Sequence, residues 1–217
     1  MHRAPIPILF DGEDILAVHK PEGIASIRER RTAGPFLQGL LAEQLGCRLY
    51  VVHRLDKDVS GVILFARTAE AHRSLNLQFE SREVGKSYRA LVYGEVREDE
   101  GVIDEPLREF GSGRVAVDRH RGRACRTEFQ VVDRLAGWTL LEITPLTGRR
   151  HQIRAHLYSI GHPVAGDPLY GDWRSRQGMS RLMLHAGRIS FRLAERGTIT
   201  VEAPCPESFE CVLEAIA

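Results

Sequence analysis

Short segments of apolar residues, many of them alternating with polar ones, cover most of the chain and are typical of β-strands. Strands are expected over residues 8–10, 15–19, 49–52, 62–65, 87–93, 124–135, 138–144, 182–185, 189–193 and 198–201. Apolar residues recur at helical spacing over residues 36–45, 68–80, 150–160 and 207–216, which predicts helices there. Because few helices separate the strands, the pattern favours an α+β fold with a mixed, mostly antiparallel β-sheet and peripheral helices.

Nothing in the composition marks a boundary between domains, so we expect one domain over residues 1–217. Apolar residues make up 43% and charged residues 27% of the chain, as in folded rather than disordered proteins. No apolar run is long enough to cross a bilayer, and residues 1–10 lack the apolar core of a secretory signal. The four cysteines have neither zinc nor redox spacing, so the sequence predicts a cytoplasmic protein with reduced thiols.

The positive charges are unevenly distributed, although the formal net charge is only +1. Three of the 30 cations are lysines and the rest are arginines, which a bias in genome base composition explains as well as function does. Residues 108–126 hold six arginines and two acidic residues, and the basic stretch 108–123 is expected to form an exposed hairpin or loop. A basic surface of this kind suits a phosphate-bearing partner, although most charge runs are only solvated surface.

Two charged segments stand out as candidate sites. The first is His53-Arg54-Leu55-Asp56-Lys57-Asp58-Val59-Ser60-Gly61, which lies between two predicted strands. Taken alone, this segment could also be a plain turn that carries no chemistry. The second runs over residues 147–154 and enters the helix predicted over 150–160. Arg150 and Arg154 are four residues apart, so we expect them on one helix face. Because the helix dipole disfavours cations at this end, their placement indicates an anionic partner.

These segments resemble motifs of the RluA family of RNA pseudouridine synthases. Residues 53–61 resemble the signature His-Arg-Leu-Asp-x-x-x-Ser-Gly, and residues 148–154 resemble Gly-Arg-x-His-Gln-Ile-Arg. Four further stretches are similar in the same order, at residues 18–23, 86–94, 161–171 and 182–186. The resemblance implies a mostly antiparallel sheet in two lobes with the active cleft between them. It also implies isomerisation of a uridine in structured RNA, without a metal or an organic cofactor.

The resemblance further implies roles for individual residues. Asp56 would be the catalytic carboxylate, Arg154 would pair with it, and Tyr88 would lie against the target uracil and help in proton transfer. Arg54 would fill the place of the flipped-out nucleotide, and Leu184 would close the uracil pocket by apolar contact. This assignment is chemically reasonable, because an Arg within about 4–6 Å lowers a carboxyl pKa by roughly 1–3 units and keeps it ionised in a closed cleft.

Contacts with the rest of an RNA stem-loop are expected from basic and polar residues of the basic stretch 108–123 and of the segment 147–154. The candidates are Arg114, Arg119, Arg121, Arg123, Arg149, Arg150, His151 and Gln152, together with the loop over residues 24–34. The small N-terminal RNA-binding module of some relatives is not found, so recognition is expected from the catalytic domain of a monomer. His151 and His156 are five residues apart, which is not the spacing of helical metal ligands, so no metal site is expected.

Two other interpretations remain open. A catalytically silent RNA-binding or RNA-chaperone protein could have the same scaffold, although the presence of Asp56, Tyr88 and Arg154 together argues against it. A carboxylate-dependent glycosidase or nuclease is the third class. Retaining glycosidases need two carboxylates about 5–5.5 Å apart. Near Asp56, only Asp58 is an obvious sequence neighbour that could supply the second carboxylate.

Overall fold

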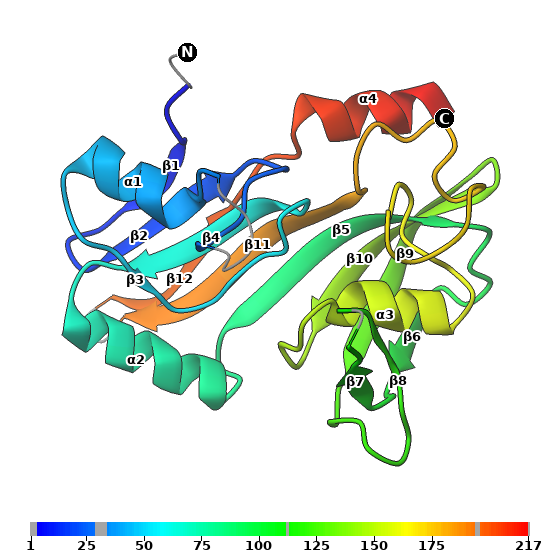
Figure 1. Ribbon diagram of the computed structural model, residues 1–217, viewed down its shortest axis with the longest axis horizontal. Coiled ribbons are helices and arrows are strands. Elements are labelled where there is room, and N and C mark those ends of the chain that lie inside the picture. The colour runs from blue at the N-terminus through cyan, green and yellow to red at the C-terminus, as the bar shows by residue number, and fades with distance from the viewer. Residues whose placement is uncertain (1–3, 29–33, 112, 194–195, 217) are drawn as a thin grey trace. The chain divides into compact units, whose positions relative to one another are not determined.

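The computed structural model describes residues 4–28, 34–111, 113–193 and 196–216. The chain forms two compact units (Figure 1). The first contains Met1–Lys86 and Ala186–Pro204, and the second contains Ser87–His185 and Cys205–Ala217. Two strands, β5 (Gly85–Tyr93) and β11 (Leu184–Leu193), begin in one unit and continue into the other. In the part of the chain that is described, no helix is long and apolar enough to cross a membrane.

The first unit is organised around strand β4 (Ser60–Ala66), all of whose residues are buried. Its strand order is β1 (Ile8–Asp11), β2 (Ile15–Lys20), β4 and β11, with β3 (Tyr50–Val51) added to β4 and β12 (Gly197–Glu202) added to β11. One of its cores contains Val62 and Leu64 of β4, Leu75 of a helix, and Phe191 of β11. Burial on both faces explains why β4 is a continuous apolar run rather than an alternating one.

The two helices of the first unit begin and end as local sequence signals predict. Helix α1 (Leu37–Leu45) ends at Gly46, whose φ of 64° is readily accessible to glycine. Helix α2 (Ala69–Glu80) begins after Thr68, whose hydroxyl accepts a hydrogen bond from the backbone N–H of Ala71. Both predicted helices are therefore confirmed.

The second unit combines antiparallel strands, a small hairpin and two helices. Its strand order is β5, β10 (Trp138–Pro145), β9 (Thr127–Leu135) and β6 (Glu100–Ile103), and the pairings of β10 with β5 and β9 and of β9 with β6 are antiparallel. Strands β7 (Leu107–Glu109) and β8 (Val115–Val117) form a separate hairpin that contacts α3 (Gln152–Ser159), as Figure 1 shows. The last helix is α4 (Glu207–Ile216). The exposed hairpin expected in the basic stretch is confirmed.

The structure differs from the local expectations at four places. Strand β6 lies in an acidic segment and was not predicted, because two of its four residues, Glu100 and Val102, are exposed and give it little apolar signal. Residues 182–193 were expected to form two strands, but β11 continues through Gly187. Helix α3 begins two residues later than predicted, because His151 has a φ of 51°. Ile160, which the sequence places in the predicted helix over residues 150–160, follows α3 and is 39% exposed.

Candidate active site

Asp56 lies in a loop of the first unit that joins β3 to β4. The backbone N–H of Val59 donates to the carbonyl of Asp56 at 3.2 Å and closes a turn. The side chain of Asp56 is half-buried, whereas the adjacent Arg54 is exposed. The loop therefore presents a carboxylate and a guanidinium, while Leu55 between them is buried.

Lys20, the last residue of β2, fixes the backbone on the C-terminal side of Asp56. Its side chain is fully buried, and its ammonium group donates to the carbonyls of Pro21, Lys57 and Val59 at 2.9, 2.9 and 2.6 Å. An ammonium group has three N–H donors, and buried donors of this kind must be satisfied. The Asp56 loop is therefore attached to β2 by a charged group that the sequence analysis did not single out.

Ser26 fixes the same loop on the N-terminal side of Asp56. Its hydroxyl donates to the carbonyl of Leu55 at 2.8 Å and accepts from the N–H of Leu55 at 3.1 Å. Ser26 is buried and precedes a loop of which residues 29–33 lie outside the described residues, so the candidate RNA contacts there are not located. Together with Lys20, this hydroxyl holds the main chain on both sides of the carboxylate.

Gly61 explains the last position of the signature. It has a φ of 125°, and a Cβ atom there would lie 2.2 Å from the carbonyl oxygen of Ala186 on β11. Any other residue would clash with this backbone and would also adopt a strained conformation. Gly61 is therefore required for β4 to pass close to β11.

His53 supports the loop through a hydrogen bond to β4. Its Nε2 accepts from the N–H of Leu64 at 2.9 Å, and its ring stacks on Phe79 with centroids 4.9 Å apart. Burial, together with the positive charge of Lys86, lowers the pKa of His53 to about 3. His53 is therefore neutral at physiological pH.

Arg154 is buried in the second unit and is held by Asp167. Its Nε and Nη2 donate to the two carboxylate oxygens of Asp167 at 2.6 and 2.7 Å, in bidentate geometry. The same carboxylate accepts the backbone N–H groups of Leu169 and Tyr170 at 2.8 and 3.1 Å. Gly166 makes the turn possible, because a Cβ atom there would lie 1.8 Å from the carbonyl of Arg181.

Asp167 is the buried partner of Arg154 that sequence reasoning missed. The composition of Gly166-Asp167-Pro168 is typical of a turn, and the two backbone N–H bonds to Asp167 show that turn. The additional signal was that an arginine inside an apolar helix face needs a carboxylate partner. Asp167 fully buried beside Arg154 supplies it.

The other expected site residues are divided between the two units. Asp56 and Arg54 belong to the first unit, whereas Tyr88, Arg154 and Leu184 belong to the second. Tyr88 lies on β5 opposite Ile143 of β10, and Leu184 is buried at the start of β11. The pairing of Asp56 with Arg154 and the uracil contacts of Tyr88 and Leu184 stay predictions.

Arg150 and Arg154 do not share a helix face, which corrects the expectation from their spacing. Arg150 precedes the helix, and the left-handed conformation of His151 turns the chain between them. Arg150 is exposed and forms an ion pair with Glu109 of β7, whereas Arg154 is buried. The rule of four-residue spacing applies only inside a continuous helix.

Several expected RNA-contact residues have partners within the protein. Gln152 is buried, accepts from the Thr147 hydroxyl and the Arg149 N–H, and donates to the Arg126 carbonyl and the Thr127 hydroxyl. Its amide therefore holds the loop before α3 rather than facing a ligand.

Arg119, Arg114 and His151 also have internal contacts. Two bonds from Arg119 lower the pKa of the Glu105 carboxyl below its usual range. Arg114 lies over the ring of Tyr170 at 5.3 Å from its centroid, and His151 Nδ1 lies 3.2 Å from the Tyr170 hydroxyl. These contacts position the residues beside the hairpin and α3.

The histidines of α3 and the following turn have structural partners. His156 is fully buried between the Thr127 hydroxyl and the Glu105 carbonyl, and burial lowers its pKa. His162 Nδ1 lies 3.0 Å from the carbonyl of Tyr93. Among the residues that the structure describes, no group of three or more His, Cys, Asp or Glu is arranged to hold a metal ion.

A family model described as RNA pseudouridylate synthase matches residues 14–159, which is more than half of the chain. The matched residues include the Asp56 loop, β5 and α3. The chain belongs to the RNA pseudouridylate synthase family. The family implied by the sequence motifs is thereby confirmed.

Curated members of the pseudouridylate synthase family match along nearly the whole chain. The sequence is 37% identical over 231 residues to the ribosomal large subunit pseudouridine synthase D of Nitrosomonas europaea, covering 98% of this chain and 65% of that protein. It is 36% identical over 210 residues to the dual-specificity RNA pseudouridine synthase RluA of Yersinia pestis, covering 95% of this chain and 98% of that protein. The chain thus spans about two thirds of the first relative and nearly all of the second.

A solved structure confirms the pseudouridylate synthase fold. The human RNA Pseudouridylate Synthase Domain Containing 1 protein matches with a TM-score of 0.83 and 26% sequence identity, over 98% of this chain and 90% of that one. The expected α+β class with a mostly antiparallel sheet is therefore confirmed.

His53 is predicted to make the synthase less stable in mild acid. Its folded-state pKa of about 3 lies below the unfolded value near 6.5, so the unfolded chain binds the extra proton as the pH falls. Replacing His53 by Gln keeps an acceptor for Leu64 but removes the titration. Urea denaturation should show that wild type loses about 2 kcal/mol more than His53→Gln between about pH 7 and about pH 5.

Exposed His120 provides the matched control for this measurement. The His120→Gln variant should keep the full wild-type loss of stability in acid. An equal loss in wild type and His53→Gln would show that His53 is not held neutral in the folded protein.

Asp167 is predicted to stabilise the synthase through Arg154. Replacing Asp167 by Asn leaves the Arg154 charge buried without its carboxylate, which costs about 3–5 kcal/mol in comparable pairs. The control is Asp172→Asn, because exposed Asp172 also accepts two backbone N–H bonds but has no ion pair among the described residues. Urea denaturation should show a large loss for Asp167→Asn and a loss below about 1 kcal/mol for Asp172→Asn. Similar losses for both variants would contradict the role of the ion pair.

Proposed function

We propose that this protein isomerises a specific uridine of ribosomal or transfer RNA to pseudouridine in the cytoplasm. The names of its relatives support this substrate class, since one is a ribosomal large subunit synthase and another is a dual-specificity RNA synthase. In the reaction the N1–C1′ bond breaks, the uracil turns, and a C5–C1′ bond forms. The hydrogen leaves C5 and N1 gains a proton, so no external reagent is consumed.

Asp56 is the catalytic carboxylate in this proposal. It acts by attacking the sugar or the base, or by moving a proton of the ribose. The observation that carries the assignment is the construction of its loop, in which Lys20 and Ser26 hold the main chain on both sides of Asp56. A carboxylate held in one place reaches a reacting atom without paying for reorganisation at each turnover.

Arg154 and Tyr88 complete the proposed chemistry. Two of the Arg154 nitrogens bind Asp167, and the planar guanidinium is thereby fixed in orientation for a second carboxylate, Asp56. Tyr88 offers a flat face for the uracil and a phenol that moves the proton at C5. Both assignments rest on the family motifs and on the placement of these residues in the second unit.

Arg54 and Leu184 are proposed to handle the displaced nucleotide. A uridine in a stem-loop must leave its stack to react, at a cost of a few kcal/mol. Exposed Arg54 has a planar group able to take the vacated position, and buried Leu184 supplies an apolar wall for the uracil.

The decisive experiment maps pseudouridines in total RNA from cells with and without the gene. The proposal expects at least one ribosomal or transfer RNA uridine to be modified only when the gene is present. Restoration by a plasmid-borne copy shows that the loss is caused by this protein. Unchanged maps would favour the alternative of a catalytically silent RNA-binding protein.

Asp56→Asn is predicted to abolish conversion while changing RNA affinity by less than about tenfold, because the amide keeps the shape but loses the charge. Release of tritium from RNA labelled at uridine C5 measures the reaction, and filter binding measures the affinity. Asp58→Asn is the matched control, since this carboxylate lies in the same loop two residues away. Full activity of Asp56→Asn, or equal loss in both variants, would refute the assignment.

A further inference from the structure

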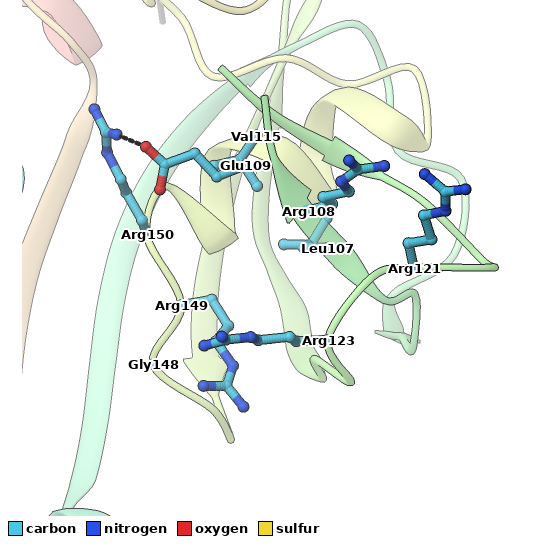
Figure 2. Close-up of a pocket in the computed structure, with 9 residues that line it drawn as sticks. All are labelled: Leu107, Arg108, Glu109, Val115, Arg121, Arg123, Gly148, Arg149 and Arg150. Atoms are coloured by element: carbon cyan, nitrogen blue, oxygen red, sulfur yellow. Dashed lines mark hydrogen bonds and ion pairs between the residues drawn. The ribbon is translucent and has the colours of Figure 1, made fainter. Parts of the chain in front are cut away.

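A basic pocket of about 480 Å³ lies beside hairpin β7–β8 of the second unit. It is lined by Arg108, Glu109, Arg121, Arg123, Arg149 and Arg150, together with apolar residues of the hairpin and Gly148. Figure 2 shows these guanidinium groups coming from three parts of the chain: the hairpin strand β7, the segment after β8, and the loop before α3. The pocket therefore brings together charges that are up to 42 residues apart in the sequence, from residue 108 to residue 150.

Ion pairs within the protein neutralise only part of this charge. Arg108 pairs with Asp118 at 3.1 Å, and Arg150 pairs with Glu109. Within the described ranges of the chain, Arg121, Arg123 and Arg149 have no carboxylate at ion-pair distance. All three arginines are exposed. Three positive charges thus remain in one pocket without a counter-charge.

The backbone that carries these three arginines is held in place. The Asp118 carboxylate accepts the N–H groups of His120 and Arg121, which shapes the turn before Arg121. Arg123 exchanges two backbone hydrogen bonds with Leu107 of β7. The Cys125 thiol donates to the Arg123 carbonyl, and the Arg149 side chain hydrogen-bonds the same sulfur. The arrangement is therefore present before any ligand arrives.

The chemistry of the three side chains favours phosphate as the ligand. Guanidinium groups that line one pocket repel one another, so an anion that contacts several of them relieves the repulsion. Arginine binds phosphate oxygens through two parallel N–H bonds, and a nucleic-acid strand offers phosphates at regular intervals. None of the three residues is among the proposed catalytic groups, so the pocket acts on a part of the RNA other than the reacting uridine.

We propose that Arg121, Arg123 and Arg149 form a docking site for the RNA phosphate backbone outside the reactive nucleotide. This inference rests on the proposed function, because RNA is the partner to which the site is assigned. The site contributes affinity and orientation of the stem-loop, while Asp56 and its partners carry out the reaction. Arg119 and Arg150, which have carboxylate partners, contribute less.

The test replaces Arg121, Arg123 and Arg149 together by Gln and measures binding to a mixture of unmodified transfer RNA transcripts. Loss of three phosphate contacts should weaken binding about 100-fold near 0.1 M salt and reduce the slope of log affinity against log salt by about 2 to 3. In pseudouridine formation on RNA from cells lacking the gene, KM should rise while kcat at saturation stays within about threefold.

A matched control removes the same charge from another part of the molecule. Arg73, Arg192 and Arg196 are exposed, lie in the first unit, and have no ion pair in the part of the structure that is described. Their triple Gln variant should leave the salt slope within about one unit of wild type. Thermal unfolding of both triple variants checks that each is folded. If the variant at Arg121, Arg123 and Arg149 is not folded, the single variant Arg121→Gln takes its place.

Three outcomes would overturn the docking site. A wild-type salt slope in the Arg121, Arg123 and Arg149 variant means that these residues do not contact phosphate. Equal weakening in the control variant means that only the total charge matters. Polyglutamate binding as tight as RNA assigns the pocket to an acidic protein. If wild type forms no pseudouridine but the binding results hold, the proposed function fails and the docking site stands.

Discussion

The buried ion pair between Arg154 and Asp167 organises much of the second unit. One carboxylate accepts two guanidinium N–H bonds and two backbone N–H bonds, so it joins helix α3 to the turn at residues 166–170. The guanidinium carbon of Arg154 lies 5.2 Å from the centroid of the Tyr170 ring. The Tyr170 hydroxyl accepts a hydrogen bond from the N–H of Val115 on the hairpin. A buried charge pair is stable only when its remaining hydrogen bonds are satisfied, and here they are supplied by the chain around it.

This arrangement connects the proposed catalytic arginine to the hairpin that carries the basic pocket. Burial raises the pKa of Tyr170, so its phenol stays protonated and keeps its hydrogen-bonding role. From the turn, the side chain of Tyr170 contacts Arg154 of α3, His151 before α3, and Val115 of β8. One buried ring therefore supports both the arginine proposed for the reaction and the hairpin beside the proposed docking site.

In the first unit, Asp56 is positioned by contacts to the main chain of its loop rather than by a buried ion pair of the kind that holds Arg154. Its loop is fixed by main-chain contacts to Lys20 and Ser26, and by a hydrogen bond from the N–H of Leu64 on β4 to the neutral ring of His53. None of these contacts is with the two charged side chains that the loop presents, so Asp56 and Arg54 are positioned through their backbone. A loop fixed through its main chain keeps the proposed catalytic carboxylate in one place.

The sequence by itself determined the secondary structure that depends on local signals and the family that depends on ordered motifs. Thr68 and Gly46 mark helix ends through their own side chain or φ angle, and the motif order indicated the synthase family. Only the tertiary structure decided which charges are free. Arg150 and Arg119 look like Arg121 and Arg123 in the sequence, but the first two meet Glu109 and Glu105 across the hairpin. Asp167 likewise looks like a turn residue until the fold places it against Arg154, 13 residues earlier. Ion pairing depends on distances between segments that are remote in the chain, and no local pattern of residues contains those distances.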